Sequence, residues 1–198
     1  MNSASLHRFG REDRPRMLRS VPTRYRGTVF ASTLEADWAA TLDHWGMAWQ
    51  YEPEAFQLPN GINYRPDFHL PNQRVWLEVK GPHDRRLGKA AELQRALYEE
   101  AGGEGWSFHA FLVIVLRPAG ADGKAHWEGS VPGQSPVVMR CSACDHHVWM
   151  DHNGIWSCRL HFDKRRTPHK PWLPHGDLFW PGELPFIRAP RPSRREGA

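Results

Sequence analysis

The stretch that decides the fold of this chain is Asn63–Gly81, NYRPDFHLPNQRVWLEVKG. Its two halves, Tyr64–Leu70 and Arg74–Lys80, are rich in aromatic and aliphatic residues, and Pro71-Asn72 between them is a turn signal. We therefore expect two antiparallel strands that form a hairpin.

Charged side chains gather at one end of this hairpin. Glu78 and Lys80 are two residues apart on the second strand, so they share a face, and their apolar neighbours face a core. The hairpin can bring Asp67 close to Glu78. Two carboxylates and the backbone carbonyl of Val79 would make a hard oxygen site suited to Mg²⁺ or Mn²⁺. The Lys80 ammonium could orient an attacking water there and offset charge on a phosphate.

A helix precedes the hairpin. Ser32 is a candidate N-cap, apolar residues recur at helical spacing after it, and Gly46 ends the pattern. Glu35 stands three residues after Ser32. It has two interpretations: a further ligand of the cation, or the acidic partner in a capping box.

The segments around the hairpin predict a sheet covered by helices. Short strands are expected at 48–51 and 55–58, a second helix at 84–101, and a continuous apolar strand at 106–116 of the kind that is buried on both faces. The order of helix, strands, helix and buried strand predicts an α/β (α+β) fold.

Pro66-Asp67 and Glu78-Val79-Lys80 resemble the defining motif of the PD-(D/E)xK nuclease superfamily, and Glu35 matches its frequent glutamate in the first helix. The text at 25–39 and 49–53 looks like phage and bacterial proteins of that group. The resemblance covers roughly residues 24–116. It implies a restriction-endonuclease-like mixed sheet flanked by helices, dependence on Mg²⁺, and cleavage of nucleic acid.

The second helix carries Gln94 and Tyr98, whose spacing is that of the Gln-x-x-x-Tyr pair in RecB-like nucleases of the same superfamily. A spacing of four places both side chains on one helical face. The resemblance implies that they lie near the DNA path. The alternative is that both are ordinary helix residues.

A second motif lies nearer the C-terminus and predicts a structural zinc site. The motif contains two pairs of Cys or His residues that are close in sequence, and Zn²⁺ takes four tetrahedral nitrogen or sulfur ligands. These ligands are Cys141, Cys144, Cys158 and His161. The module resembles a zinc ribbon, and zinc would supply most of its folding free energy, on the order of 10 kcal/mol. The alternatives are a fourth ligand from among His146, His147 and His152, a redox-active Cys pair, or an HNH-type nuclease.

Basic and aromatic residues accompany this module. Lys164, Arg165 and Arg166 follow it directly and could contact phosphates. Trp149 and Trp156 could stack on bases, or they could pack in the small core of the ribbon.

Composition limits the class of protein. The chain has 198 residues, 40% of them apolar, and a net charge of +4, so wholesale disorder is excluded. Its longest apolar run, Ala110–Leu116, is far shorter than the roughly 20 residues that span a bilayer. The first 26 residues hold seven Arg and no apolar stretch, unlike a secretory signal. We therefore expect a cytoplasmic protein, in a bacterium or a phage-infected host, with no membrane partner.

Charge is distributed unevenly, with basic ends around an acidic middle. This pattern suits arms that grip a polyanion and a centre that holds cations. The basic residues are 21 Arg and 5 Lys, a bias that a GC-rich genome also produces.

Together these features predict a Mg²⁺-dependent deoxyribonuclease with a zinc ribbon, acting in phage DNA metabolism, recombination and repair, or anti-phage defence. The open alternative is a non-catalytic or partner-dependent nucleic-acid-binding protein whose zinc ribbon docks DNA or a larger complex, with a helicase or a second copy of the chain as candidate partners. The expected organisation is a flexible basic arm at 1–26, a nuclease core at 27–117, a linker at 118–136, the zinc ribbon at 137–163 and a Pro/Arg-rich tail at 164–198.

Overall fold

The computed structural model describes residues 20–102, 112–151, 158, 160 and 176–191, together with the backbone of 7–9. The helices are α1 (Thr33–His44) and α2 (Gly88–Glu100). The strands are β1 (His7–Phe9), β2 (Thr23–Tyr25), β3 (Thr28–Phe30), β4 (Gln50–Tyr51), β5 (Ala55–Gln57), β6 (Asn63–Tyr64), β7 (Phe68–Leu70), β8 (Val75–Val79), β9 (Leu112–Arg117), β10 (His126–Gly129), β11 (Pro136–Cys141), β12 (His147–Asp151) and β13 (Gly176–Phe179).

The central element is a five-stranded mixed sheet with the order β10-β9-β8-β7-β4. The predicted hairpin is confirmed as β7 and β8, with Phe68 opposite Leu77 and Leu70 opposite Val75. Strands β8 and β9 are parallel, and α2 lies in the crossover between them. All other neighbours in this sheet are antiparallel. The predicted mixed α+β class is therefore confirmed.

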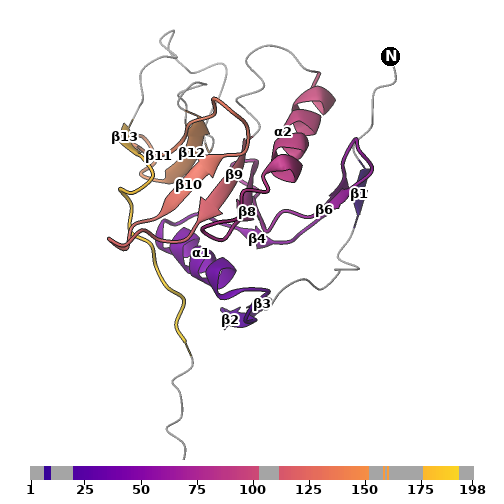
Figure 1. The fold of residues 1–198 in the computed structure, drawn as a ribbon. Helices are drawn as coiled ribbons and strands as arrows, with labels where there is room; N and C mark the ends of the chain where they lie inside the picture. The colour runs from indigo at the N-terminus through magenta and orange to yellow at the C-terminus, as the bar shows by residue number, and fades with distance from the viewer. Residues whose placement is uncertain are drawn as a thin grey trace, which may run out of the picture.

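The two helices cover opposite faces of this sheet (Figure 1). Strand β9 alternates, with Leu112, Ile114 and Leu116 in the apolar cluster that includes α1, and Val113 and Val115 in the cluster that includes α2. All five side chains are fully buried. Residues 112–116 of the continuous apolar run therefore lie in a strand that is buried on both faces, as the sequence predicts, and its residues 106–111 lie outside the described residues.

The first helix begins and ends where its sequence signals predict. Ser32 is the N-cap, and its Oγ accepts a hydrogen bond from the Glu35 backbone N at 3.1 Å. Gly46 follows the helix with a φ of +70°, a conformation that glycine adopts without strain.

Two features of the expected hairpin differ from the structure. The strand expected over Tyr64–Leu70 is divided into β6, which pairs with β5, and β7, which belongs to the central sheet. Pro66 lies at the break and has no N–H to donate to a ladder. The turn of the β7–β8 hairpin also spans residues 71–74 rather than two residues, and Arg74 there has a φ of +56°.

The segment expected as a linker, 118–136, contains β10, which pairs with β9 at the edge of the central sheet. Trp127 on β10 explains this placement, because its indole is buried in the main core beside Trp45 and Trp149. The β11–β12 hairpin of the Cys module is also packed on this core through Trp149. The module is therefore joined to the sheet by apolar contacts and does not stand apart from it.

Both ends of the chain contribute to the fold where the structure describes them. The basic arm contains β1, paired with β5, and the start of β2. In the expected tail, β13 pairs with β11, and Arg191 forms an ion pair with the buried Asp37 of α1 at 2.7 Å. None of the helices that the structure describes has the length and apolar character needed to cross a bilayer.

Candidate functional site

Asp67 lies where β7 begins, and it is fixed by two backbone hydrogen bonds. Its Oδ2 accepts from the Val79 N at 2.7 Å, and its carbonyl accepts from the Glu52 N at 2.9 Å. The residue is 8% exposed. The register that pairs Phe68 with Leu77 therefore sets the Asp67 carboxylate against the end of β8.

Three carboxylates from three elements meet at this point. One oxygen each of Glu35, Glu52 and Asp67 lies within 4.8 Å of the others, a spacing that could hold a metal ion. We call these three residues the carboxylate cluster. Glu35 comes from the first turn of α1, and Glu52 follows β4 directly with a φ of +45°. All three residues are buried or nearly so.

Glu35 contacts the N-cap residue and is also a member of the carboxylate cluster. Its Oε1 accepts from the Ser32 hydroxyl at 2.8 Å, a second contact between the two residues beside the N-cap bond, whereas in a capping box the carboxylate accepts from the N-cap backbone N. Its Oε2 accepts from the Ala31 N at 3.1 Å and from the Tyr51 hydroxyl at 2.5 Å. The cap therefore holds the carboxylate in place beside Asp67 and Glu52.

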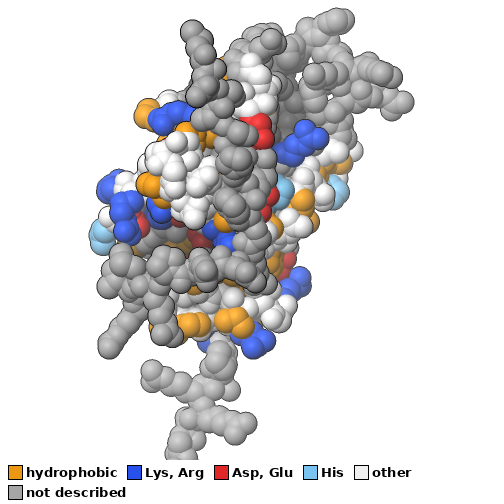
Figure 2. All heavy atoms as spheres, turned by 90° about the vertical axis from the view of Figure 1, so that its right-hand side faces the viewer, with side chains coloured by type: hydrophobic (Ala, Val, Ile, Leu, Met, Phe, Trp, Pro, Cys, Tyr) orange, Lys and Arg blue, Asp and Glu red, His pale blue; other side chains and the backbone are white. Residues whose placement is uncertain are grey.

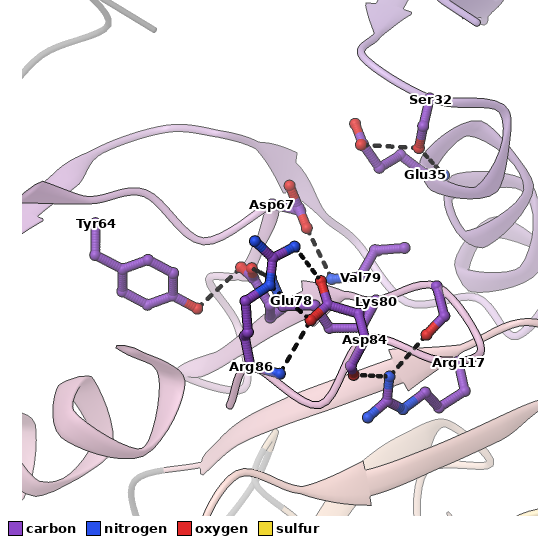
Figure 3. A network of polar contacts seen from close by, with 11 residues as sticks. Ser32, Glu35, Tyr64, Asp67, Glu78, Val79, Lys80, Asp84, Arg86 and Arg117 are labelled. Carbon is purple, nitrogen blue, oxygen red and sulfur yellow. Dashed lines mark hydrogen bonds and ion pairs between the residues drawn. The ribbon is translucent and has the colours of Figure 1, made fainter. Parts of the chain in front are cut away.

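Glu78 and Lys80 form a second group near Asp67 (Figure 3). Lys80 Nζ donates to Glu78 Oε1 at 2.6 Å, and the Tyr64 hydroxyl donates to Glu78 Oε2 at 2.9 Å. Glu78 is not one of the three residues whose oxygens lie within 4.8 Å of one another. The structure therefore brings Asp67 together with Glu35 and Glu52, and it pairs Glu78 with Lys80.

Burial is the largest influence on the pKa values of Asp67 and Glu78. It raises the pKa of Asp67 well above the usual value, and the charges of Glu78 and Glu35 raise it further. Burial also raises the pKa of Glu78, against the opposing effects of Lys80 and the Tyr64 hydroxyl. Ionising all of these carboxylates together is therefore costly unless a cation compensates their charge.

Lys80 and Tyr64 keep their protons near neutral pH. Burial lowers the pKa of Lys80, but nearby carboxylates, Glu78 first, outweigh it, so the pKa lies above its usual value. Burial and the charge of Glu78 raise the pKa of Tyr64 well above its usual value. The site thus contains a fixed ammonium and a fixed hydroxyl donor.

Gln94 is a core residue in the structure, which fits the alternative of an ordinary helix residue; its place near a DNA path stays a prediction. Its side chain is fully buried, and its Oε1 accepts from the Val113 N at 3.2 Å and from Ser130 Oγ at 2.8 Å. It therefore links α2 to β9 and to the end of β10. Tyr98 is half-buried on the same helix, and its role in DNA contact stays a prediction.

Three thiols meet at the far end of the β11–β12 hairpin. The Sγ atoms of Cys141, Cys144 and Cys158 lie within 4.8 Å of one another, so they could hold a metal ion. We call them the thiol cluster. The Sγ atoms of Cys144 and Cys158 are 3.7 Å apart, far beyond the roughly 2 Å of a disulfide bond. Burial and the neighbouring thiols raise the pKa of Cys158 to about 12.

Two of the alternative histidine ligands have other contacts. His146 Nδ1 lies 2.6 Å from the Cys144 carbonyl oxygen, and His147 Nδ1 lies 3.1 Å from the Trp45 carbonyl oxygen. Neither belongs to the group of three thiols. His161, His152, Lys164, Arg165, Arg166 and Trp156 lie outside the described residues.

The Gln73 side chain connects the thiol-bearing β11–β12 hairpin to the β7–β8 hairpin. Gln73, in the β7–β8 turn, accepts from the Trp149 N at 2.8 Å and donates to the His147 carbonyl at 3.3 Å. Trp149 itself is fully buried in the main core, so it packs and does not present a stacking surface.

Sequence reasoning missed Glu52 and Tyr64. Each had a weak signal: Glu52 stands between a short strand and Pro53, and Tyr64 lies on the strand just before Pro66-Asp67. Only the pairing of β4 with β7 places Glu52 next to Asp67.

Comparisons with protein-family models, with curated proteins and with solved structures find no match to this chain.

Proposed function

We propose that the protein is a Mg²⁺- or Mn²⁺-dependent nuclease that hydrolyses phosphodiester bonds of DNA, with the restriction-endonuclease-like architecture that its motifs resemble. The observation that carries the proposal is the meeting of the buried carboxylate cluster with the Glu78–Lys80 pair at one end of β7 and β8. The mixed sheet with helices on both faces is consistent with it.

The donor set fits a hard divalent cation. Carboxylate oxygens are the preferred protein ligands of Mg²⁺, and these are buried where their mutual repulsion is least screened. Asp67, Glu35 and Glu52 would hold the cation, with Glu78 and the Val79 carbonyl beside them. When bound, the cation supplies an electrophile that offsets charge on a phosphodiester under attack.

Lys80 acts as a cation and not as a base, because its neighbouring carboxylates keep it protonated. Its ammonium lies 2.6 Å from Glu78 Oε1, where it can orient a water and balance negative charge on a phosphate oxygen. Tyr64 holds the other oxygen of Glu78, so this carboxylate is fixed from both sides.

We propose that the thiol cluster holds a structural Zn²⁺, with His161 as the fourth ligand. Three thiolates in one place suit zinc, and a fourth nitrogen ligand closes a tetrahedral site. Because Trp149 and Gln73 join this hairpin to the core, zinc would stabilise the nuclease fold as well as the module.

Cleavage of linear and circular DNA by the full chain tests the proposal. The protein is loaded with zinc and then held in buffer without other divalent metals, since EDTA would strip both sites. Cutting on addition of Mg²⁺ or Mn²⁺ is expected, and Asp67→Asn and Lys80→Met should abolish it. The matched exposed or part-exposed controls Asp122→Asn and Lys124→Met should cut like the wild type. DNA binding by a folded wild type that never cuts would support the non-catalytic alternative.

A further inference from the structure

A cluster of exposed cations follows Lys80 directly. Residues 81–89, which we call the basic loop, run from the end of β8 into the first turn of α2 and include Arg85, Arg86 and Lys89. All three side chains are exposed. Asp84 is the acidic residue of this loop, so with Lys80 the cations outnumber the anions.

The basic loop is fastened to the sheet. Nη1 of Arg117, at the end of β9, donates to the Gly81 carbonyl at 2.9 Å and to the Asp84 carbonyl at 2.7 Å (Figure 3). Its Nε donates to Glu128 on β10 at 2.6 Å. The Arg117 side chain is only 14% exposed, so it fixes the loop from beneath and does not itself present charge to a ligand.

Asp84 organises the inner part of the loop. It accepts from Arg86 Nε at 2.9 Å and Nη2 at 2.8 Å, and Arg86 with Lys80 lowers the pKa of Asp84 below its usual range. This ion pair occupies one edge of the Arg86 guanidinium. Arg85 and Lys89 are therefore the cations of the loop that we assign to an external anion.

Several of the other described cations are paired with a carboxylate. On the face seen in Figure 2, Lys and Arg side chains are scattered among carboxylates and do not form one continuous area. Arg26, Arg140 and Arg191 are each paired with an Asp. The basic loop thus differs in carrying several cations within a few residues of the proposed catalytic lysine.

We propose that the basic loop binds the phosphate backbone of DNA next to the phosphodiester held at Lys80, with Arg85 and Lys89 as the contacting residues. The choice of DNA rests on the proposed function. Contacts of this kind position the backbone without reading sequence. Because each neutralised phosphate releases counterions, they also make affinity depend on salt.

Fluorescence anisotropy with a labelled DNA duplex tests this assignment. The zinc-loaded full chain is titrated without Mg²⁺ or Mn²⁺, so that cleavage does not interfere, at several salt concentrations. Arg85→Gln with Lys89→Gln should weaken binding about tenfold and reduce the slope of log affinity against log salt by close to 2. The matched double variant Arg74→Gln with Arg188→Gln removes the same charge from exposed positions elsewhere and should bind like the wild type.

A second variant tests the fastening of the loop. Arg117→Lys keeps the charge but cannot donate to both loop carbonyls and Glu128 together, so it should weaken DNA binding with no change in the number of exposed cations. Circular dichroism shows whether each variant is folded.

Equal losses in the two double variants, no loss in the loop variant, or no DNA binding by the wild type would each overturn the proposal. Cleavage is scored separately. If the wild type cuts DNA and the loop variant binds DNA normally, the result refutes DNA binding by the basic loop and leaves the nuclease proposal standing. Loop-dependent binding without any cleavage refutes the nuclease and leaves the binding surface standing.

Discussion

Replacing Asp67 by Asn should make the metal-free protein more stable. The carboxylate lies with Glu35 and Glu52 inside a group whose oxygens are within 4.8 Å of one another. At an effective dielectric constant of about 20, two ionised carboxylates at that separation repel by about 3.5 kcal/mol. Asn keeps the shape and an oxygen that can accept from the Val79 N, so little is lost in exchange.

Protonation reduces this repulsion in the wild type, so we expect a gain of about 2 kcal/mol at pH 8 in the free energy of unfolding. For a chain of this length that corresponds to a rise in Tm of roughly 4–8 °C. The pKa of Asp67 is higher in the folded protein than in the unfolded chain. The contribution of Asp67 to the stability of the folded protein is therefore fully present below the pKa that Asp67 has in the unfolded chain. It is lost as the pH rises through the pKa that Asp67 has in the folded protein. The advantage of Asp67→Asn should accordingly grow from pH 5 to pH 8.

Thermal unfolding followed by circular dichroism, on zinc-loaded protein, measures this difference. Mg²⁺ should raise the Tm of the wild type more than that of Asp67→Asn, because binding to the folded state stabilises it. The exposed control Asp122→Asn should change little at any pH. If Asp67→Asn is less stable than the wild type at pH 8, and equally so at pH 5, the carboxylates are not crowded and the reasoning fails.

Three further predictions concern neighbouring parts of the structure. Tyr64→Phe removes a donor that lowers the pKa of Glu78, so the acidic limb of a pH–cleavage profile should move to higher pH; an unmoved limb would contradict the role of this contact. Gln94→Leu leaves the buried Val113 N and Ser130 Oγ without their acceptor and should cost about 1–3 kcal/mol of unfolding free energy in a urea titration, with DNA affinity unchanged. Cys144→Ser should reduce zinc, measured by elemental analysis, below one ion per chain and lower the Tm of the whole fold in a single transition; a separate early transition would show that the module unfolds alone.

The central sheet could be predicted from local signals. The alternation along β8 and the unbroken apolar run of β9 follow from strand periodicity, and the cap of α1 follows from Ser32 and Gly46. The break at Pro66 was readable in principle, because proline cannot donate to a ladder, but the aromatic residues around it favour one continuous strand.

The features that the sequence did not predict depend on contacts between residues far apart in the chain. Glu52 lies next to Asp67 because β4 pairs with β7, and no sequence pattern near Glu52 predicts the register of that pairing. Segment 118–136 is rich in Gly and Pro, which favours a linker. Trp127 in this segment is nevertheless buried against Trp45 and Trp149, and this packing places β10 at the edge of the central sheet. Gln94 has the spacing of a DNA-binding pair, yet the fold buries its side chain against β9, where it accepts from the Val113 N.

The most direct test of the central claim is metal-dependent cleavage of circular DNA by the zinc-loaded wild type, Asp67→Asn and Lys80→Met, all shown to be folded. We predict cutting by the wild type only when Mg²⁺ or Mn²⁺ is added, and none by either variant. Cutting that persists in both variants, or a folded wild type that leaves every DNA substrate intact with either metal, would contradict the nuclease assignment.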